Sequence, residues 1–359
     1  GSEMCIRDSY TGSYTSRYAD LVWQAGLSSQ DYGASTFYSA KFDNQWEATR
    51  RIITSAQADI KPFGDECLVI TPQAYWHRDV DHYQLTRGKE GAKNGENYHR
   101  TDVYGASLNA HATWLLGKTA VGMDIRKEHI LSTAYGDLLP ENEWKDIHGT
   151  DRRYDHRGDR TNTSLFLEHN VILGGFTLSA GVLANRNTGL DGDFRFYPGV
   201  DLSYRPNEMW KFYASWNKAL RVPTYTDLYT SNSVQQGDTG LRPERTSTFK
   251  AGTRFRTRGV EAVVSGFYSK GNDIIDWVYE TEESRKYHAM NIGKLDNMGY
   301  SVDATLNMTE LLPGSFVTRI KAGYARIHQR HTTEQPVYRS LYALEYLRHK
   351  ATFQLDHRI

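Results

Sequence analysis

Apolar and polar residues alternate with a period of two along most of this chain of 359 residues. Such alternation is typical of β-strands, because successive side chains of a strand point to opposite faces of the sheet. In each segment one face is apolar and the other carries polar or charged side chains. The pattern is clearest at residues 108–116, 210–216, 249–255 and 316–324. It predicts about fourteen strands, the first at residues 18–28 and the last at residues 351–356.

Short turns and long polar connections follow one another between these segments. Tight turns are predicted at Pro62-Phe63-Gly64, Gly117-Lys118, Gly174-Gly175, Pro206-Asn207, Arg258-Gly259 and Pro313-Gly314. The long connections include residues 84–100, 132–160 and 221–244. Short turns on one rim and long loops on the other are the layout of an outer-membrane β-barrel. A propeller or a sandwich has shorter connections on both sides.

Composition changes this picture only a little. The formal net charge is zero and the sequence has no basic block, which argues against a nucleic-acid partner. No run of about 18 apolar residues predicts a membrane-spanning helix. The 24 Tyr and 8 Trp suit the aromatic girdles of a barrel in lipid, although a soluble all-β protein with Tyr-rich faces has a similar composition. The two cysteines make no disulfide framework.

The strongest motif lies at residues 221–244. It consists of Arg221, Pro223, Leu228 and Tyr229, followed by Gly237, Asp238, Leu241, Arg242, Pro243 and Glu244. This order resembles TonB-dependent outer-membrane receptors, in which Arg-x-Pro and Leu-Tyr open an extracellular loop and Gly-Asp-x-x-Leu-Arg-Pro-Glu re-enters the barrel. We favour an architectural role for Pro223, Leu228, Gly237, Leu241, Pro243 and Glu244. We expect Glu244 to pair with a lumen arginine such as Arg221.

The resemblance covers nearly all of residues 10–359. It implies an all-β protein, an antiparallel transmembrane β-barrel that is partial, with about fourteen of about 22 strands and without the plug domain. We interpret residues 1–9 as a non-native segment that precedes the barrel residues. They contain no apolar stretch of the kind that an export signal needs.

The resemblance also implies a function. Such receptors sit in the bacterial outer membrane, in contact with its lipid, and capture scarce, bulky nutrients through their extracellular loops. Energy reaches them from an inner-membrane TonB-type complex through the plug. Receptors for cobalamin and for ferric siderophores are the most similar, with a slight preference for cobalamin. A passive porin-like channel, a glycan-importing receptor and a soluble glycan-binding β protein remain as alternatives.

Candidate ligand contacts are aromatic and polar residues in the predicted outer loops. Early in the chain these are Phe37, Tyr38 and Trp46, and in the motif they are Arg221, Tyr225 and Tyr229. An ordinary interfacial girdle would contain the same residue types. The acidic stretch with Asp151, Asp155, His156 and Asp159 favours a solvated loop over a calcium site, because its spacing matches no EF-hand. No phosphate loop, HExxH, GxSxG or paired-cysteine set predicts an enzyme, a cofactor or a metal.

Overall fold

The structure is a computed structural model that describes residues 2–36, 41–190, 192–344 and 346–358. Strands make up most of it, and its two α-helices are short: α1 at Tyr225–Tyr229 and α2 at Met308–Leu311. In the described part of the chain, no helix is long and apolar enough to cross a membrane. Phe37 and Tyr38 lie outside the described residues.

The principal sheet has sixteen strands. Its path follows chain order through β1 (Ser2–Thr15), β2 (Ala19–Ser35), β3 (Gln45–Ile60), β4 (Leu68–Gln84), β5 (Glu96–Trp114), β6 (Gly117–Ser132), β10 (His156–Leu173), β11 (Phe176–Asn187), β12 (Arg195–Tyr204), β13 (Trp210–Arg221), β15 (Glu244–Arg256), β16 (Val260–Asn272), β19 (Gly293–Asn307), β20 (Val317–Thr333) and β22 (His349–His357). The short β7 (Asp137–Leu138) pairs with β10. The prediction of an all-β antiparallel sheet is confirmed. The first strand, β1, precedes the predicted start and includes most of the segment set aside as non-native.

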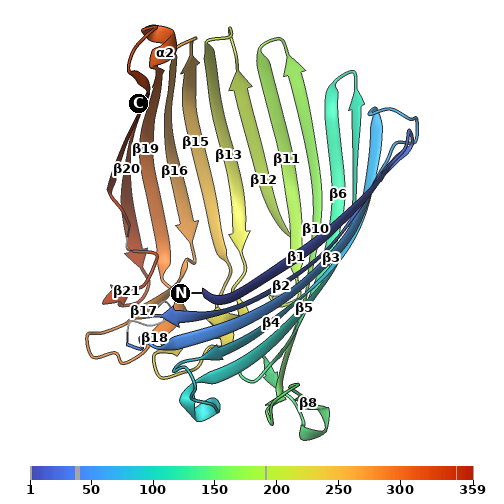
Figure 1. The fold of residues 1–359 in the computed structure, drawn as a ribbon, viewed down its shortest axis with the longest axis vertical. Coiled ribbons are helices and arrows are strands. Elements are labelled where there is room, and N and C mark those ends of the chain that lie inside the picture. Colours follow the sequence, from blue (N-terminus) through green and yellow to red (C-terminus); the bar gives the residue numbers. More distant parts are fainter. Residues whose placement is uncertain (1, 37–40, 191, 345, 359) are drawn as a thin grey trace. The chain divides into compact units, whose positions relative to one another are not determined.

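The chain forms two compact units. The first consists of Gly1–Leu167, Leu183–Phe196 and Thr224–Gly240, and the second consists of Glu168–Val182, Tyr197–Pro223 and Leu241–Ile359. In the first unit β1 to β6 pair in succession, and in the second unit β13, β15, β16, β19, β20 and β22 do so (Figure 1). Each unit is described separately below.

The predicted turns and long connections are confirmed, except that the turn predicted at Gly117-Lys118 lies two residues earlier, at Leu115-Leu116, and Gly117 begins β6. The turn between β3 and β4 is closed by the Gly64 N–H donating to the Lys61 carbonyl at 2.9 Å. In the second unit, the Thr257 N–H donates to the Val260 carbonyl at 2.7 Å between β15 and β16. The long connections begin where predicted, after Gln84, Ser132 and Arg221, the last residues of β4, β6 and β13.

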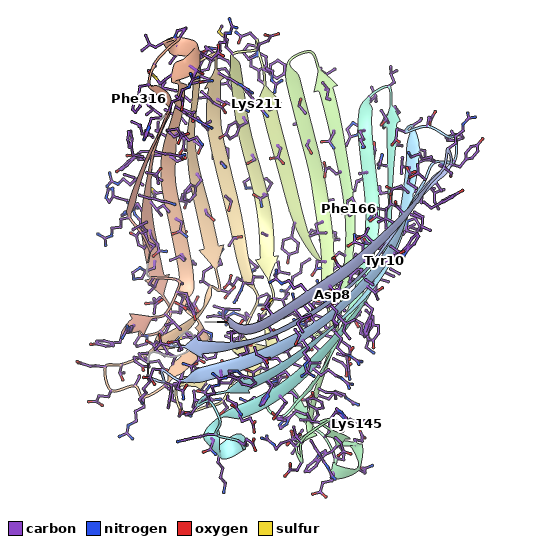
Figure 2. All side chains as sticks on the ribbon, viewed as in Figure 1. Asp8, Tyr10, Lys145, Phe166, Lys211 and Phe316 are labelled. Atoms are coloured by element: carbon purple, nitrogen blue, oxygen red, sulfur yellow. The ribbon has the colours of Figure 1, made fainter. Side chains whose placement is uncertain are left out.

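The register keeps the predicted faces together from strand to strand. In the first unit, Leu108 of β5 lies opposite Pro72 of β4 and Met123 of β6, whereas Asn109 lies opposite Thr71 and Gly122. In the second unit, Phe249 of β15 lies opposite Trp216 and Tyr268, and its neighbour Lys250 lies opposite Ser215 and Phe267. Side chains project from both faces of the strands (Figure 2). The exposed large apolar residues of these strands include Leu108, Trp114, Met123, Phe212, Phe249 and Tyr324.

The long connections are folded and carry small cores of their own. In the first unit, Tyr98 and Leu131 pack with Leu139, Ile147 and Tyr154 of the connection after β6, and Trp144 covers them. That connection contains the hairpin of β8 (Lys145–Asp146) and β9 (Arg153–Tyr154). In the second unit, β17 (Ile275–Tyr279) pairs with β18 (Tyr287–Asn291) and β21 (Arg339–Ser340). The core there consists of Ile274, Val278, Ile292 and Leu295.

Candidate functional site

The part of the motif in the first unit forms a capped helix. The Asp227 N–H donates to Thr224 Oγ1 at 3.1 Å, and the Thr224 N–H donates to Asp227 Oδ2 at 3.0 Å, which makes a capping box at the start of α1. The returning chain packs directly on the helix: a Cβ on Gly237 would lie 2.7 Å from the Asp227 carbonyl oxygen. A glycine is therefore required at this position for steric reasons.

The part of the motif in the second unit forms an ion pair at the strand ends. Arg221 ends β13 and lies opposite Glu244, the first residue of β15. The Arg221 guanidinium donates to Glu244 Oε1 at 3.1 Å, so the expected pair is present. The same oxygen accepts the Ile275 N–H at 2.9 Å. Glu244 thus ties the base of the connection to the start of β17.

Asp273 holds the Leu-Arg-Pro-Glu corner in place. Its carboxylate accepts from Arg242 at 2.8 Å and from Arg245 at 2.6 Å. Burial opposes the charge of Asp273, but these two arginines outweigh it and lower the pKa of the carboxyl. Asn291 closes the corner by donating to the Arg242 and Asp273 carbonyls at 2.9 and 2.7 Å. Asp273 has a φ of 55°, which its short polar side chain tolerates, and nothing in its sequence context predicted this role.

Three of the sequence-predicted contacts lie in the first unit, Trp46 on β3 and Tyr225 and Tyr229 on α1. Trp46 lies in β3 rather than in a loop, because the strands extend beyond their apolar segments; it packs edge-on against His82, with 5.1 Å between ring centroids. In α1, the Tyr225 ring lies 4.6 Å from the Arg160 guanidinium and 6.2 Å from the Tyr229 ring. Burial raises the pKa of Tyr225 to about 12, so its hydroxyl stays protonated.

The first unit encloses a cavity of about 180 Å³ beside α1. Its lining comes from the ends of three strands, the residues after β6, and α1 with the segment that follows it: Glu47, Asp81, Tyr83, Asn97, His99, Ala134, Tyr135, Thr226, Thr230, Ser231, Asn232 and Gln235. The His99 ring stacks on Tyr135 at 4.2 Å, and the Tyr135 hydroxyl lies 3.1 Å from Thr230 Oγ1. The sequence analysis does not predict these residues, because each is a common polar residue of a strand or loop and no local motif links them.

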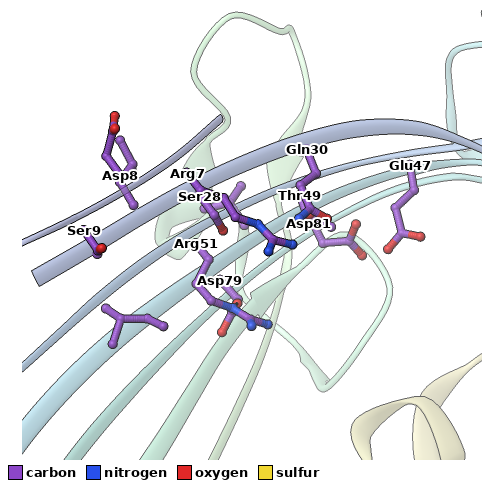
Figure 3. Close-up of a pocket in the computed structure, with 14 residues that line it drawn as sticks. Arg7, Asp8, Ser9, Ser28, Gln30, Glu47, Thr49, Arg51, Asp79 and Asp81 are labelled. Carbon is purple, nitrogen blue, oxygen red and sulfur yellow. The ribbon is translucent and has the colours of Figure 1, made fainter. Parts of the chain in front are cut away.

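A larger cavity of about 710 Å³ lies over β1 to β4 and shares Glu47 and Asp81 with the smaller one. Its basic residues are Arg7 and Arg51 (Figure 3). The Arg51 guanidinium binds the Asp79 carboxylate directly opposite on β4. Arg51 is thus neutralised by its neighbour.

The smaller cavity lies at strand ends beyond the apolar band of the sheet, whereas the larger one also includes mid-strand residues such as Leu27 and Ile53. Exposed apolar side chains on β3 and β5 begin at Ile52 and Tyr104, which lie opposite Arg78 and Trp76 of β4. Residues 79–84 therefore extend past the segment that suits lipid. There, burial and the adjacent Glu47 carboxylate raise the pKa of Asp81 to about 8.

The acidic stretch after β6 forms pairs instead of a cluster. The His156 ring lies 2.7 Å from Asp155, and the His129 ring lies 2.8 Å from Asp159. In the part of the chain that the structure describes, no three His, Cys, Asp or Glu side chains are placed to hold a metal ion.

Comparison with known proteins agrees with this architecture. Residues 6–356 match the family described as TonB dependent receptor-like, beta-barrel. The copper transporter OprC has a TM-score of 0.71 at 16% identity, over 97% of this chain and 56% of OprC. The unliganded ferric citrate transporter FecA has a TM-score of 0.68 at 14% identity, over 98% and 55% of the two chains.

The apoprotein form of the FrpB iron transporter from Neisseria meningitidis has a TM-score of 0.64 at 17% identity, over 92% of this chain and 53% of FrpB. Identities this low show a shared fold, and this chain spans a little over half the length of each of the three structures. The family match covers nearly the whole chain. This chain therefore belongs to the TonB-dependent receptor-like β-barrel family, whose members are proteins of the bacterial outer membrane.

Proposed function

We propose that this chain is barrel sequence of an energy-coupled uptake receptor for a bulky, scarce nutrient, either cobalamin or a ferric siderophore. The observation that carries the proposal is the first unit's polar cavity at the long-connection ends of β3, β4 and β5. Its walls are fixed by the packed connection after β6 and by the capped helix α1, as a ligand site requires. The ligand is bound and carried without chemical change.

Energy coupling requires a partner. The TonB-type complex of the inner membrane would act through a plug domain, which is not among these residues. We assign ligand contacts to Trp46, Tyr225 and Tyr229. Phe37, Tyr38 and Arg221 belong to the same proposed set. The cavity residues join this set.

Uptake in living cells tests the proposal. The receptor that contains this chain is expressed in cells lacking their own receptors, and cobalamin and a panel of ferric siderophores are supplied side by side. We expect growth rescue by one of these ligands, and its loss when the energising partner is deleted. Uptake that persists without the partner would indicate a passive channel. Rescue by an oligosaccharide alone would indicate glycan import.

Truncation of Trp46 tests the assigned contacts. Trp46→Ala removes an aromatic face at the rim, and we expect it to weaken ligand binding about tenfold or more, because buried aromatic side chains dominate binding energy. Lys89→Ala, at an exposed position in the neighbouring connection, is the control and should change binding little. Equal affinities of the two variants would remove Trp46 from the site.

A further inference from the structure

The side of β20 that is predicted to face lipid changes from apolar to basic partway along the strand. Tyr324 on this side is exposed. Arg326, His328 and Arg330 follow it on the same side and are exposed too. Ile327, between them, is less exposed and lies on the opposite side. Because outward side chains of a strand in lipid are apolar, the reversal marks where β20 leaves the hydrocarbon, toward the long connection that follows it.

Neighbouring strands carry lysines at matching positions. Lys218 of β13 lies two residues after Trp216, on the same side of the sheet. Lys270 of β16 lies two residues after Tyr268 in the same way. One row of directly opposed residues crosses β13, β15, β16, β19 and β20 (Figure 1): Lys218, Ser247, Lys270, Asp296 and Arg330. The Cα atoms of Lys270 and Arg330 are thus two strand spacings apart, about 10 Å. We define the basic patch as Lys218, Lys270, Arg326 and Arg330.

Exposed aromatic side chains border the basic patch on its apolar side. They are Phe249, Tyr268, Tyr300 and Tyr324. The rings of Tyr300 and Tyr324 lie 6.2 Å apart, and Tyr300 lies directly opposite Arg326. Aromatic residues are enriched where a membrane protein passes from the hydrocarbon to the headgroups. Since the long connections of an outer-membrane barrel are extracellular, the basic patch lies at the headgroup level of the outer leaflet.

The charges of the basic patch are not neutralised within the second unit. Among the described residues, no acidic side chain forms a salt bridge with a member of the patch. Arg245 on the same side of the sheet differs, because it is bound to Asp273 at 2.6 Å. The acid within the row is Asp296, and its Oδ2 accepts the Tyr268 hydroxyl at 3.2 Å. The four cations of the patch thus outnumber the one carboxylate beside them, and the surface carries an excess of positive charge.

We propose that the basic patch binds the phosphate groups of an anionic lipid in the outer leaflet. Ammonium and guanidinium groups donate charge-assisted hydrogen bonds to phosphate, and they attract anionic headgroups at the membrane surface. The long side chains of Lys270 and Arg330 can reach one phosphate from two sides, because about 10 Å separates their Cα atoms. Val264, Val302 and Tyr324, exposed on the apolar side of the patch, lie where the acyl chains of the same lipid would pack. This role goes beyond nutrient uptake and does not depend on which nutrient is carried.

Two lipids with the same acyl chains test the headgroup preference. Binding of dilauroyl phosphatidic acid and of dilauroyl phosphatidylcholine to the intact receptor in detergent is measured by native mass spectrometry. We expect phosphatidic acid to bind about tenfold more tightly. The double variant Lys270→Gln/Arg330→Gln should lose this preference. Asp296→Asn removes the carboxylate between these cations and should strengthen the binding of phosphatidic acid by about threefold or more, an effect that loss of the fold cannot produce.

The matched control is Lys250→Gln/Lys321→Gln, which removes two cations from the opposite side of β15 and β20. The control changes the net charge equally and should keep the preference. Equal binding of the two lipids by the unaltered receptor would overturn the proposal, as would an equal loss of preference in the control. Displacement of phosphatidic acid by an equal concentration of glycerol 3-phosphate would overturn it too, since the patch would then bind a soluble phosphate ester. None of these outcomes depends on the uptake assay, so the two proposals fail separately.

Discussion

At the scale of single residues, the motif is explained by contacts with the backbone and by one ion pair. Gly237 leaves room for the carbonyls of α1, Thr224 and Asp227 cap that helix, and Glu244 binds Arg221. Each of these roles shapes the base of a connection. These contacts account for the residue types of Gly237, Thr224, Asp227 and Glu244, whereas Arg221 also belongs to the proposed ligand contacts.

Gly237→Ala should loosen the connection that holds α1. Its Cβ would meet the Asp227 carbonyl oxygen at 2.7 Å and the Leu228 carbonyl at 2.8 Å, and backbone atoms cannot move aside as a side chain can. We expect a cost of about 1–3 kcal/mol, seen as faster amide exchange in residues 225–237. Gly266→Ala is the control, since the nearest atom to its Cβ lies at 3.6 Å. Unchanged exchange in the Gly237 variant would show that the close packing is not rigid.

At the scale of elements, one buried glutamate forms hydrogen bonds with two long connections of the first unit, those after β4 and after β6. Glu96, the first residue of β5, accepts the Gly91 N–H at 2.6 Å and Arg152 at 3.2 Å, and its Oε1 lies 2.8 Å from His82 Nε2. Burial alone would raise the pKa of Glu96, but Gly91, His82, Gln84 and Tyr98 together lower it to about 2. The charge of Glu96 therefore stabilises both connections.

This pKa predicts how the connections respond to acid. The folded pKa of Glu96 lies below its ordinary value of 4.5. The contribution of Glu96 to the stability of the two connections is therefore complete above pH 4.5 and is lost as the pH falls toward about 2. Pepsin should leave residues 139–154 intact at pH 4 and cut them at pH 2. Glu96→Gln should be cut at both values, whereas Glu90→Gln, at an exposed position nearby, should behave as the unaltered receptor does. Cleavage of the unaltered receptor at pH 4 would contradict the prediction.

At the scale of the whole molecule, strands of both units keep an apolar face and a more polar one, as the registers of β4, β5 and β6 and of β13, β15 and β16 show. The residues predicted to face lipid are Trp114, Phe212, Phe249 and Tyr324, and those predicted to face the lumen are Lys250, Arg254, Arg319 and Lys321. The registers of the second unit place Phe249 among aromatic residues, and place Lys250 on the opposite face. In an outer-membrane protein such a division separates lipid from water.

Cysteine labelling of adjacent positions checks this division. In a receptor with Cys5 and Cys67 replaced by serine, Phe249→Cys should react with a reagent dissolved in lipid, and Lys250→Cys with a water-soluble one. Phe249→Arg should destabilise the receptor in liposomes by about 2–4 kcal/mol, measured by urea unfolding, because a charge would enter the lipid. Lys250→Cys reacting from the lipid phase would reverse the assignment of the faces.

The sequence by itself determined the strands, the turns, the two faces and the family. These are local properties: a period of two fixes which side chains share a face, and Gly and Pro fix where the chain turns. The Arg221–Glu244 pair was also predictable, because the motif specifies both residues. The sequence prediction lacks the first strand, because it interprets residues 1–9 as non-native, and it places Trp46 in a loop, because strand ends beyond lipid lose the apolar alternation.

Only the tertiary structure decided what the outer connections build. Glu47, Asp81 and His99 are ordinary polar strand residues in the sequence, and Tyr135 and Thr230 belong to connections far from them. Strand register brings the two carboxylates together, and the packing of α1 closes the cavity over them. Burial and the charge of a neighbour, which set the pKa of Asp81 and of His99, are properties of that three-dimensional arrangement and not of any local pattern.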